Sequence, residues 1–273
     1  MTEPRAVKVL ITGASGNLGS KIRAHLETLT DYQLVLLDRH GSSDGSVIEA
    51  DLRRYRASWI QHFQGVRVVL HLAANPNPHD AWPLLVEDNV DSTINVYEAA
   101  VANGVTRVVF ASSLHAVLGN AGAREKVAAD MPSNPANFYG ATKAVGEHLG
   151  KSYAEKYGLS VICLRIGFVR RGDNAAPHDH PDLAVQRRWL SNADLCQAMR
   201  RAITAPDVRF AVCNVTSRIA GSHWELESAR TVLGFDPRDE HTPLPPTAIA
   251  KFCTRCVRFL RTRWARLAPQ RQH

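Results

Sequence analysis

Short apolar runs rich in β-branched residues alternate with longer segments of helical periodicity along most of the chain. Residues 7–12 read as a buried strand, and residues 18–29 place apolar side chains on one face of a following helix. The same pattern predicts further strands at 34–38, 47–50, 66–72, 107–111 and 161–166, and helices at 53–63, 84–103 and 137–157. Such alternation is typical of right-handed βαβ units that form a parallel sheet.

This order of elements predicts an α/β protein with a doubly wound, Rossmann-type parallel sheet. We expect one domain over residues 1–245, with a small substrate lobe built from about 168–190 and 214–245. Residues 246–273 form a basic, amphipathic C-terminal tail in this interpretation. Ligands of doubly wound sheets bind beyond the carboxyl ends of the strands, so the residues that follow each strand are the candidates for chemistry.

A glycine-rich turn follows the first strand. Its sequence, Thr12-Gly13-Ala-Ser-Gly16-Asn-Leu-Gly19, lies between a predicted strand and a predicted helix. In that context Gly13 allows a tight turn, Gly16 lets the backbone approach a pyrophosphate, and Gly19 permits close packing of the helix. The turn predicts a dinucleotide cofactor, although an ordinary glycine-rich turn is the alternative.

The second strand ends in an acid, Asp38, about twenty residues beyond the glycine turn. A carboxylate at this position accepts hydrogen bonds from both ribose hydroxyls of NAD and repels the 2′-phosphate of NADP. Arg39 is a complication, because a guanidinium group pairs well with a phosphate. We expect NAD to be the cofactor.

A tyrosine and a lysine, Tyr139 and Lys143, lie four residues apart in the helix predicted at 137–157. This spacing puts the phenol and the ammonium group on one face. A neighbouring ammonium stabilises a phenolate and lowers the pKa of the tyrosine, so Tyr139 could take a proton from a substrate hydroxyl. A solvated pair on a helix surface is the alternative, and the motifs elsewhere in the chain argue against it.

The chain resembles the extended short-chain dehydrogenase/reductase (NAD-dependent epimerase/dehydratase) family. The matching pieces occur in the family's order and spacing: Thr12-Gly13-x-x-Gly16-x-x-Gly19, Asp38, Asp51-Leu52, His71-Leu-Ala-Ala74, Asn89, Phe110-Ala-Ser-Ser113, Tyr139-x-x-x-Lys143 and Leu164-Arg165. The resemblance implies a catalytic tetrad of Asn89, Ser113, Tyr139 and Lys143, in which Asn89 acts from a local break in its helix.

The same resemblance implies a set of residues that hold NAD. These are Gly13, Ser15, Gly16, Asn17, Leu18, Gly19, Asp38, Arg39, Asp51, Leu52, Leu72, Ala73, Ala74, Asn89, Tyr139, Lys143 and Ile166. In the reaction implied, Tyr139 is the general base, Lys143 also bonds the nicotinamide ribose, and Ser113 holds the substrate oxygen.

Within this family the chain is most similar to the small uronate dehydrogenases. The similarity rests on Val108-Val-Phe-Ala-Ser-Ser-x-His115, Arg165-Ile-Gly167, Trp189-Leu-Ser191 and Leu233-Gly-Phe235. It implies a substrate site formed by Asn75, Ser113, Leu114, His115, Tyr139, Gly167, Phe168 and Arg171. His115 would bond a polar substrate or only its own loop. Arg170 and Arg171 would clamp a carboxylate or remain solvated.

Two positions depart from the uronate dehydrogenase pattern. Leu114 stands where those enzymes have Asn, and Phe168-Val169 stand where they have two Ser. A buried substrate group left without a partner costs about 1–3 kcal/mol. We therefore expect weak or absent activity on glucuronate and galacturonate, unless Arg170, Arg171 or His115 supplies the missing contact.

The remaining features limit the choice of partners. The net charge of +7 comes from seven cations in residues 251–273, and the rest of the chain carries 26 basic and 26 acidic side chains. We expect no nucleic-acid partner. The tail would dock on the body or on another subunit, so we expect a homo-oligomer, and a membrane surface is the less favoured alternative. Five scattered cysteines suggest a reduced, cytoplasmic protein.

We expect no metal site. The pair His178-x-His180 has no further ligand cluster near it, and Cys253-x-x-Cys256 lacks a second pair. The preferred function is an NAD-dependent dehydrogenase that oxidises a hydroxyl of a sugar acid or a related small polar substrate. A sugar-nucleotide epimerase or dehydratase with bound NAD is the second interpretation. A non-catalytic, NAD-responsive binding protein is the third.

Overall fold

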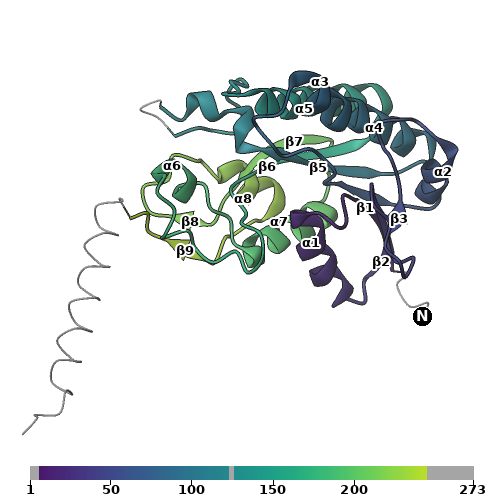
Figure 1. The fold of residues 1–273 in the computed structure, drawn as a ribbon, viewed down its shortest axis with the longest axis horizontal. Helices are drawn as coiled ribbons and strands as arrows, with labels where there is room; N and C mark the ends of the chain where they lie inside the picture. The colour runs from purple at the N-terminus through teal and green to yellow at the C-terminus, as the bar shows by residue number, and fades with distance from the viewer. Residues whose placement is uncertain (1–5, 123–125, 245–273) are drawn as a thin grey trace, which may run out of the picture.

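A computed structural model describes residues 6–122 and 126–244. Its centre is a parallel seven-stranded sheet with the strand order β3-β2-β1-β4-β5-β6-β7 (Figure 1). The strands are β1 Val7–Thr12, β2 Tyr32–Asp38, β3 Ile48–Glu49, β4 Val68–His71, β5 Arg107–Ser113, β6 Ser160–Ile166 and β7 Phe210–Val215. The strands are added outward from β1 first on one side, to β3, and then on the other side from β4 to β7, which confirms the predicted doubly wound, Rossmann-type fold.

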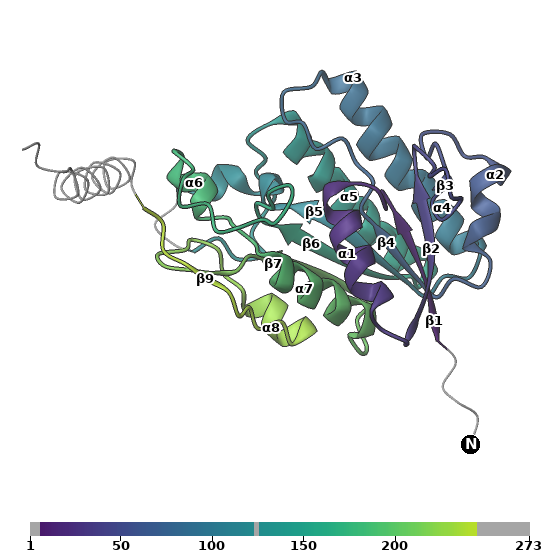
Figure 2. The same ribbon diagram turned by 60° about the horizontal axis from the view of Figure 1, so that its bottom comes forward.

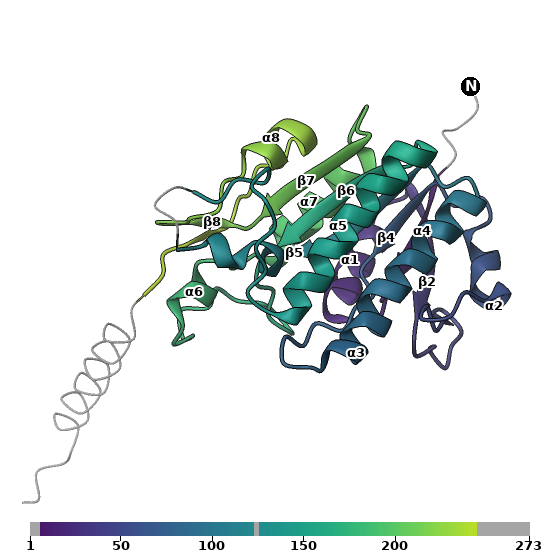
Figure 3. The ribbon, with the colours of Figure 1, turned by 90° about the horizontal axis from the view of Figure 1, so that it is seen from above.

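Helices cover both faces of the sheet. On one face lie α1 Asn17–Glu27, α7 Asn192–Thr204 and α8 Glu227–Leu233 (Figure 2). The other face carries α2 Ala57–Ile60, α4 Ser92–Ala102 and α5 Phe138–Tyr157 (Figure 3). Alternate residues of each strand point into the two cores. In β1, for example, Val9 and Ile11 join the α1/α7/α8 core, and Leu10 joins the α2/α4/α5 core.

Two predicted helices differ from the observed ones. The helix expected at 53–63 begins only at Ala57, because Arg53 bonds the carboxylate of Asp51 and holds residues 51–53 in a turn. The helix expected at 84–103 consists of α3 Trp82–Leu85, a π-helical segment Val86–Asp91 and α4. The π-helical segment contains Asn89, so the break predicted in this helix is present.

The last part of the described chain forms a small group of elements beside β6 and β7. It contains α6 Leu183–Gln186 and a two-stranded parallel sheet of β8 Arg218–Ile219 and β9 Glu240–His241. They gather near one end of the main sheet in Figure 1. We keep the division into a main domain and a substrate lobe as a proposal. The basic tail at 246–273, with its Cys253-x-x-Cys256 sequence, lies outside the described residues.

The start of α7 carries a helix cap from the motif Ser191-x-x-Asp194. The Ser191 hydroxyl accepts the N–H of Asp194 at 3.0 Å, as in a capping box. The Asp194 carboxylate instead accepts the Ser217 hydroxyl at 2.6 Å and the N–H of Arg238 at 2.7 Å. Asp194 therefore ties the group containing β8 and β9 to α7. No helix of the described chain is long and apolar enough to cross a membrane.

Candidate active site

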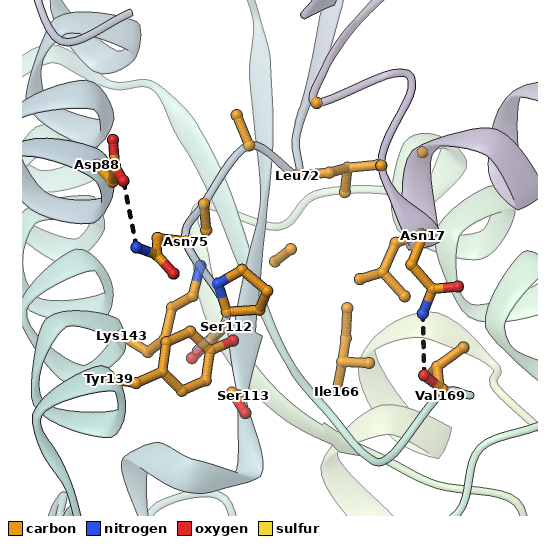
Figure 4. Close-up of a pocket in the computed structure, with 18 of the residues that line it drawn as sticks. Asn17, Leu72, Asn75, Asp88, Ser112, Ser113, Tyr139, Lys143, Ile166 and Val169 are labelled. Atoms are coloured by element: carbon orange, nitrogen blue, oxygen red, sulfur yellow. Dashed lines mark hydrogen bonds between the residues drawn. The ribbon is translucent and has the colours of Figure 1, made fainter. Parts of the chain in front are cut away.

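A cavity of about 1020 Å³ opens at the carboxyl ends of the strands. It is bordered by the glycine turn after β1, by the ends of β2, β4, β5 and β6, and by the first turns of α5. Figure 4 shows side chains from these distant segments facing one another across it. This is the edge at which doubly wound sheets bind their ligands.

The glycine turn leaves no room for side chains. Gly13 has a φ of 70°, and a Cβ there would lie 2.7 Å from the backbone nitrogen of Ala73. A Cβ at Gly19 would lie 2.0 Å from the carbonyl oxygen of Gly13. The turn leads into the N-terminus of α1. The first turn of this helix has no acidic residue, so no carboxylate there would repel a phosphate. This backbone cradle at a helix N-terminus fits the pyrophosphate of a dinucleotide.

Asp38 borders the same end of the cavity, at the carboxyl end of β2. Its carboxylate accepts the N–H of Ser15 at 2.9 Å, which fixes it beside the glycine turn. The neighbouring Arg39 forms an ion pair with Asp88. Asp38 is thus placed to receive ribose hydroxyls, and an acid already engages the guanidinium group that could have received a 2′-phosphate.

Buried hydrogen bonds align the strand ends around this half of the cavity. Thr12 bonds Nδ1 of His71 at 2.8 Å, and Nε2 of His71 bonds the Thr93 hydroxyl at 3.0 Å. The Thr93 hydroxyl in turn donates to the carbonyl of Asn89 at 2.5 Å. Burial lowers the pKa of His71 to about 3, so the imidazole remains neutral in this chain of bonds.

The serine, tyrosine and lysine of the predicted tetrad come together at the middle of the cavity. Tyr139 and Lys143 project from α5, and Ser113 projects from the end of β5 opposite them (Figure 4). The Nζ atom of Lys143 lies 5.7 Å from the centre of the Tyr139 ring and 4.9 Å from that of Phe110. Asn137 caps α5 by accepting the N–H of Gly140 at 2.8 Å, which fixes the start of this helix.

The protonation of this pair differs from the sequence-based expectation. Burial raises the pKa of Tyr139 to about 12, with a hydrogen bond to Ser113 acting in the opposite direction. Burial also lowers the pKa of Lys143 to about 7, against the negative charge of Glu147. The prediction that Lys143 lowers the pKa of the phenol is therefore wrong for the protein groups alone, because burial disfavours both charged forms.

Asn89 does not border the cavity. Its Oδ1 atom accepts the N–H of Asn75 at 2.7 Å, and its Nδ2 atom donates to the carbonyl of Asn75 and to the Thr142 hydroxyl. The side chain thus holds the loop after β4 against α5. Asp51 likewise does not border the cavity. Both oxygens of its carboxylate accept hydrogen bonds from the guanidinium group of Arg53. All other predicted cofactor-binding residues border it.

The predicted substrate residues all border the cavity, but they differ in what they offer to a ligand. Leu114 is fully buried and packs with Val117, Val127 and Trp224 in a separate small hydrophobic cluster. It also borders the cavity, as predicted, and the expectation that it offers a substrate no hydrogen bond stays a prediction. Asn75 already bonds Asp80 and Asp88.

The two arginines proposed as carboxylate clamps also differ. Arg170 is paired with Asp179, with N···O distances of 2.8 and 3.2 Å, whereas Arg171 borders the cavity without an ion pair among the described residues. Asp179 lies within the suggested His178-x-His180 pair, and His178 packs on His241. The described part of the chain contains no group of three or more potential metal ligands.

Sequence reasoning missed one charged residue at the substrate end, Arg188. It lies in the run Gln186-Arg187-Arg188-Trp189, in which the sequence gives no reason to prefer Arg188 over Arg187. Sequence reasoning also gave no role to Glu147. This buried carboxylate accepts the Ser112 hydroxyl and pairs with Arg165 at 2.8 Å, directly beside Ser113 and one helical turn beyond Lys143.

Comparison with known proteins agrees with this geometry. The chain is 38% identical over 251 residues to L-arabinose 1-dehydrogenase (NAD(P)(+)) from Haloferax volcanii, covering 85% of this chain and 96% of that protein. It is 32% identical to the NAD-dependent glucose-6-phosphate dehydrogenase of the same organism, covering 85% and 93%.

Among solved structures, the chain is similar to an Agrobacterium tumefaciens uronate dehydrogenase mutant complexed with NAD. The TM-score is 0.73 at 26% identity, covering 86% of each chain. The resemblance to uronate dehydrogenases is thereby confirmed. The model of the NAD dependent epimerase/dehydratase family matches residues 9–170, the segment that carries the glycine turn, Ser113, Tyr139 and Lys143. The chain belongs to the NAD-dependent epimerase/dehydratase family.

Proposed function

We propose that this protein is an NAD-dependent dehydrogenase that oxidises a ring hydroxyl of a sugar, with the anomeric hydroxyl as the preferred position. The observation that carries this proposal is the convergence of Ser113, Tyr139 and Lys143 on the cavity that the glycine turn and Asp38 border. The anomeric position is suggested by the relative named L-arabinose 1-dehydrogenase.

In this reaction Ser113 and Tyr139 hold the hydroxyl of the substrate between them. Tyr139 takes the hydroxyl proton while the carbon–hydrogen bond breaks and a carbon–oxygen double bond forms. NAD held by the glycine turn and Asp38 would supply the hydride acceptor and a positive charge that favours the phenolate. Lys143 adds to that charge when it is protonated, and Glu147 raises the pKa of this lysine against the effect of burial.

The supporting residues keep this arrangement in place. Asn89 ties the loop at Asn75 to α5, so we assign it a positioning role. At one side of the cavity, the Asn17 amide donates to the carbonyl of Val169 at 2.9 Å (Figure 4). The cofactor end and the substrate end are thus joined by a direct hydrogen bond.

The formation of NADH tests the proposal. The purified protein should reduce NAD with one or more of L-arabinose, D-glucose, D-galactose, D-glucuronate, D-galacturonate and glucose 6-phosphate. A sugar-nucleotide epimerase would instead interconvert UDP-glucose and UDP-galactose without net NADH. If no sugar gives NADH while a UDP-sugar is epimerised, the dehydrogenase assignment is wrong.

We also infer that the protein forms a homo-oligomer. Trp82 and Phe138 are 41% and 57% exposed and contact each other edge to face, and Leu84 of the same short helix as Trp82 is 54% exposed. Exposed large apolar side chains in contact with each other favour burial against another surface. Light scattering tests this inference, since a monomeric mass that is independent of concentration would contradict it.

A further inference from the structure

Backbone hydrogen bonds hold Arg188 at the wall of the cavity. The carbonyl oxygen of Arg188 accepts the N–H of Phe168 at 2.6 Å. The N–H of Leu190 donates to the carbonyl oxygen of Phe168 at 2.9 Å. A Cβ at position 167 would lie 2.1 Å from this same carbonyl oxygen, so Gly167 is required for the close approach. Nε of Arg188 donates to the carbonyl of Ala184 at 2.9 Å, and the residue borders the cavity.

The charge of this half-buried guanidinium group is not balanced by an acid in contact with it. Within residues 6–122 and 126–244, no carboxylate oxygen lies within the 4.0 Å ion-pair distance of Arg188. Asp182 acts on it electrostatically from farther away, and burial lowers the pKa of Arg188. Burying a charge without a partner is costly, so the site is better satisfied when a ligand brings an anion.

The partner of Arg188 at this wall is His115, and the hydrogen bonds fix its tautomer. Nδ1 of His115 lies 2.8 Å from Nδ2 of Asn137, and Nε2 lies 3.3 Å from a guanidinium nitrogen of Arg188. Both neighbours are donors, but a neutral imidazole accepts at only one nitrogen. The pKa of His115 is lowered to about 4 by burial, so the ring is neutral at physiological pH.

The hydrogen bond that caps the N-terminus of α5 decides which ring nitrogen of His115 accepts a hydrogen bond. Asn137 uses its Oδ1 atom for the N–H of Gly140, so its NH₂ group must face His115. Nδ1 is then the acceptor and Nε2 carries the proton. Consequently the contact between Arg188 and His115 joins two donors, and neither satisfies the other. Both N–H groups need an acceptor that the described protein residues do not supply.

We propose that Arg188 and His115 form a subsite for the oxyanion, a carboxylate or a phosphate, of an acidic sugar substrate. A carboxylate or phosphate offers adjacent oxygens that match two converging N–H donors. The subsite lies next to the chemistry, because the His115 backbone N–H bonds the Ser113 hydroxyl at 3.2 Å and its ring lies 5.6 Å from the Tyr139 ring. The bound oxyanion would orient the sugar so that its reacting hydroxyl meets Ser113 and Tyr139.

This inference rests on the proposed function and gives it a substrate class. It also replaces the expectation of weak activity on uronates, which was based on Leu114 and Phe168. Arg188 borders the cavity and would supply the kind of contact that Leu114 and Phe168 do not offer.

Paired substrates test the subsite. Steady-state kinetics should compare D-glucuronate and glucose 6-phosphate with D-glucose, and D-galacturonate with D-galactose. We expect kcat/KM to be higher for the acidic sugar than for the neutral one in at least one pair. A preference for the uronates indicates a carboxylate site, and a preference for glucose 6-phosphate indicates a phosphate site. Arg188→Gln should reduce that preference roughly 100-fold, mainly through a higher KM for the acidic sugar, with a much smaller change for the neutral sugar. Arg188→Lys should restore part of it, because a lysine keeps the charge without the planar fork.

Arg187→Gln is the matched control, since Arg187 is the adjacent arginine and does not border the cavity. It should leave the preference unchanged. Equal losses on acidic and neutral sugars in Arg188→Gln, or a parent enzyme that favours neutral sugars throughout, would overturn the proposal.

A binding measurement separates this inference from the proposed function. Calorimetry on the NADH-bound protein should show D-glucuronate or inorganic phosphate binding to the parent, and roughly 100-fold weaker binding to Arg188→Gln. If no sugar is oxidised but this difference is found, the dehydrogenase assignment fails and the subsite stands. If the parent and the variant bind these anions equally, the subsite is wrong even where sugars are oxidised.

Discussion

The two ends of the cavity are built in different ways. The cofactor end consists mainly of backbone, where strand and helix come so close together at Gly13 and Gly19 that side chains are excluded. The substrate end consists of side chains such as His115 and Arg188, which come from separate segments and lie 3.3 Å apart. A backbone cradle has a sequence signature at fixed spacing, whereas a cluster of side chains does not. The two ends should therefore respond differently to mutation.

The largest expected effect lies where the two ends meet. Tyr139→Phe should lower kcat by about 10²- to 10⁴-fold, because the base is lost, while NAD affinity stays near that of the parent. Calorimetry and steady-state kinetics measure the two quantities. Tyr157→Phe, on the exposed end of the same helix, is the matched control and should keep full turnover. If Tyr139→Phe retains turnover close to the parent, Tyr139 is not the base.

The next largest effect concerns the buried ion pair beneath the substrate end. Arg165→Met leaves the Glu147 carboxylate buried without its cation, which should cost about 3–5 kcal/mol of unfolding free energy. Urea denaturation measures this loss. Arg218→Met, which removes exposed contacts to Asp236 and Glu240, should leave the unfolding midpoint near that of the parent. Equal stabilities of the two variants would show that the buried pair does not hold this end together.

At the cofactor end, a single side chain is expected to control cofactor choice. The parent should bind NAD more tightly than NADP, because the Asp38 carboxylate repels a 2′-phosphate. Asp38→Ser should weaken NAD binding by about 1.5–3 kcal/mol, the range of a hydrogen bond to a charged group, and reduce the preference over NADP. Calorimetry with both cofactors measures the change. Tighter binding of NADP by the parent would contradict the assignment and indicate Arg39 as the partner of the phosphate.

The smallest effect is a dependence of stability on pH. The pKa of Lys143 is about 7 in the folded protein and near its ordinary value of 10.5 when unfolded. Between these values the unfolded chain binds more protons, so Lys143 contributes a rise in stability with pH of about 1.4 kcal/mol per unit. Comparing urea denaturation of the parent and Lys143→Met between pH 7 and 9 isolates this contribution. Identical slopes would show that Lys143 keeps its proton in the fold.

The sequence predicted the elements whose pattern is local. The buried strand at 7–12, the glycine turn and the tyrosine–lysine spacing each occupy one short segment, and the fold built from them is confirmed. It did not predict β7, whose half-buried residues Phe210, Ala211 and Val212 lack a continuous buried pattern.

The sequence also could not show which arginine faces the cavity. Each of the two arginine pairs in the sequence looks uniform, but the structure separates their members: Arg170 pairs with Asp179, Arg171 and Arg188 border the cavity without an ion pair among the described residues, and Arg187 does not border it. The direction of the Leu114 side chain was hidden for the same reason, because it depends on Val127 and Trp224 far along the chain. Side-chain partnerships of this kind are set by tertiary packing and leave no periodic signal.

The hydrogen bond from Asn17 to Val169 joins residues that are 152 positions apart. A second bond, from Lys21 to the carbonyl of Gly172, spans 151 positions beside it. During synthesis on the ribosome, the glycine turn emerges early, but the loop that faces it across the cavity emerges only after β6. Contacts of such long sequence separation form late in folding, because the intervening chain must first be ordered. A nascent chain that ends before residue 169 therefore lacks one wall of its cofactor site.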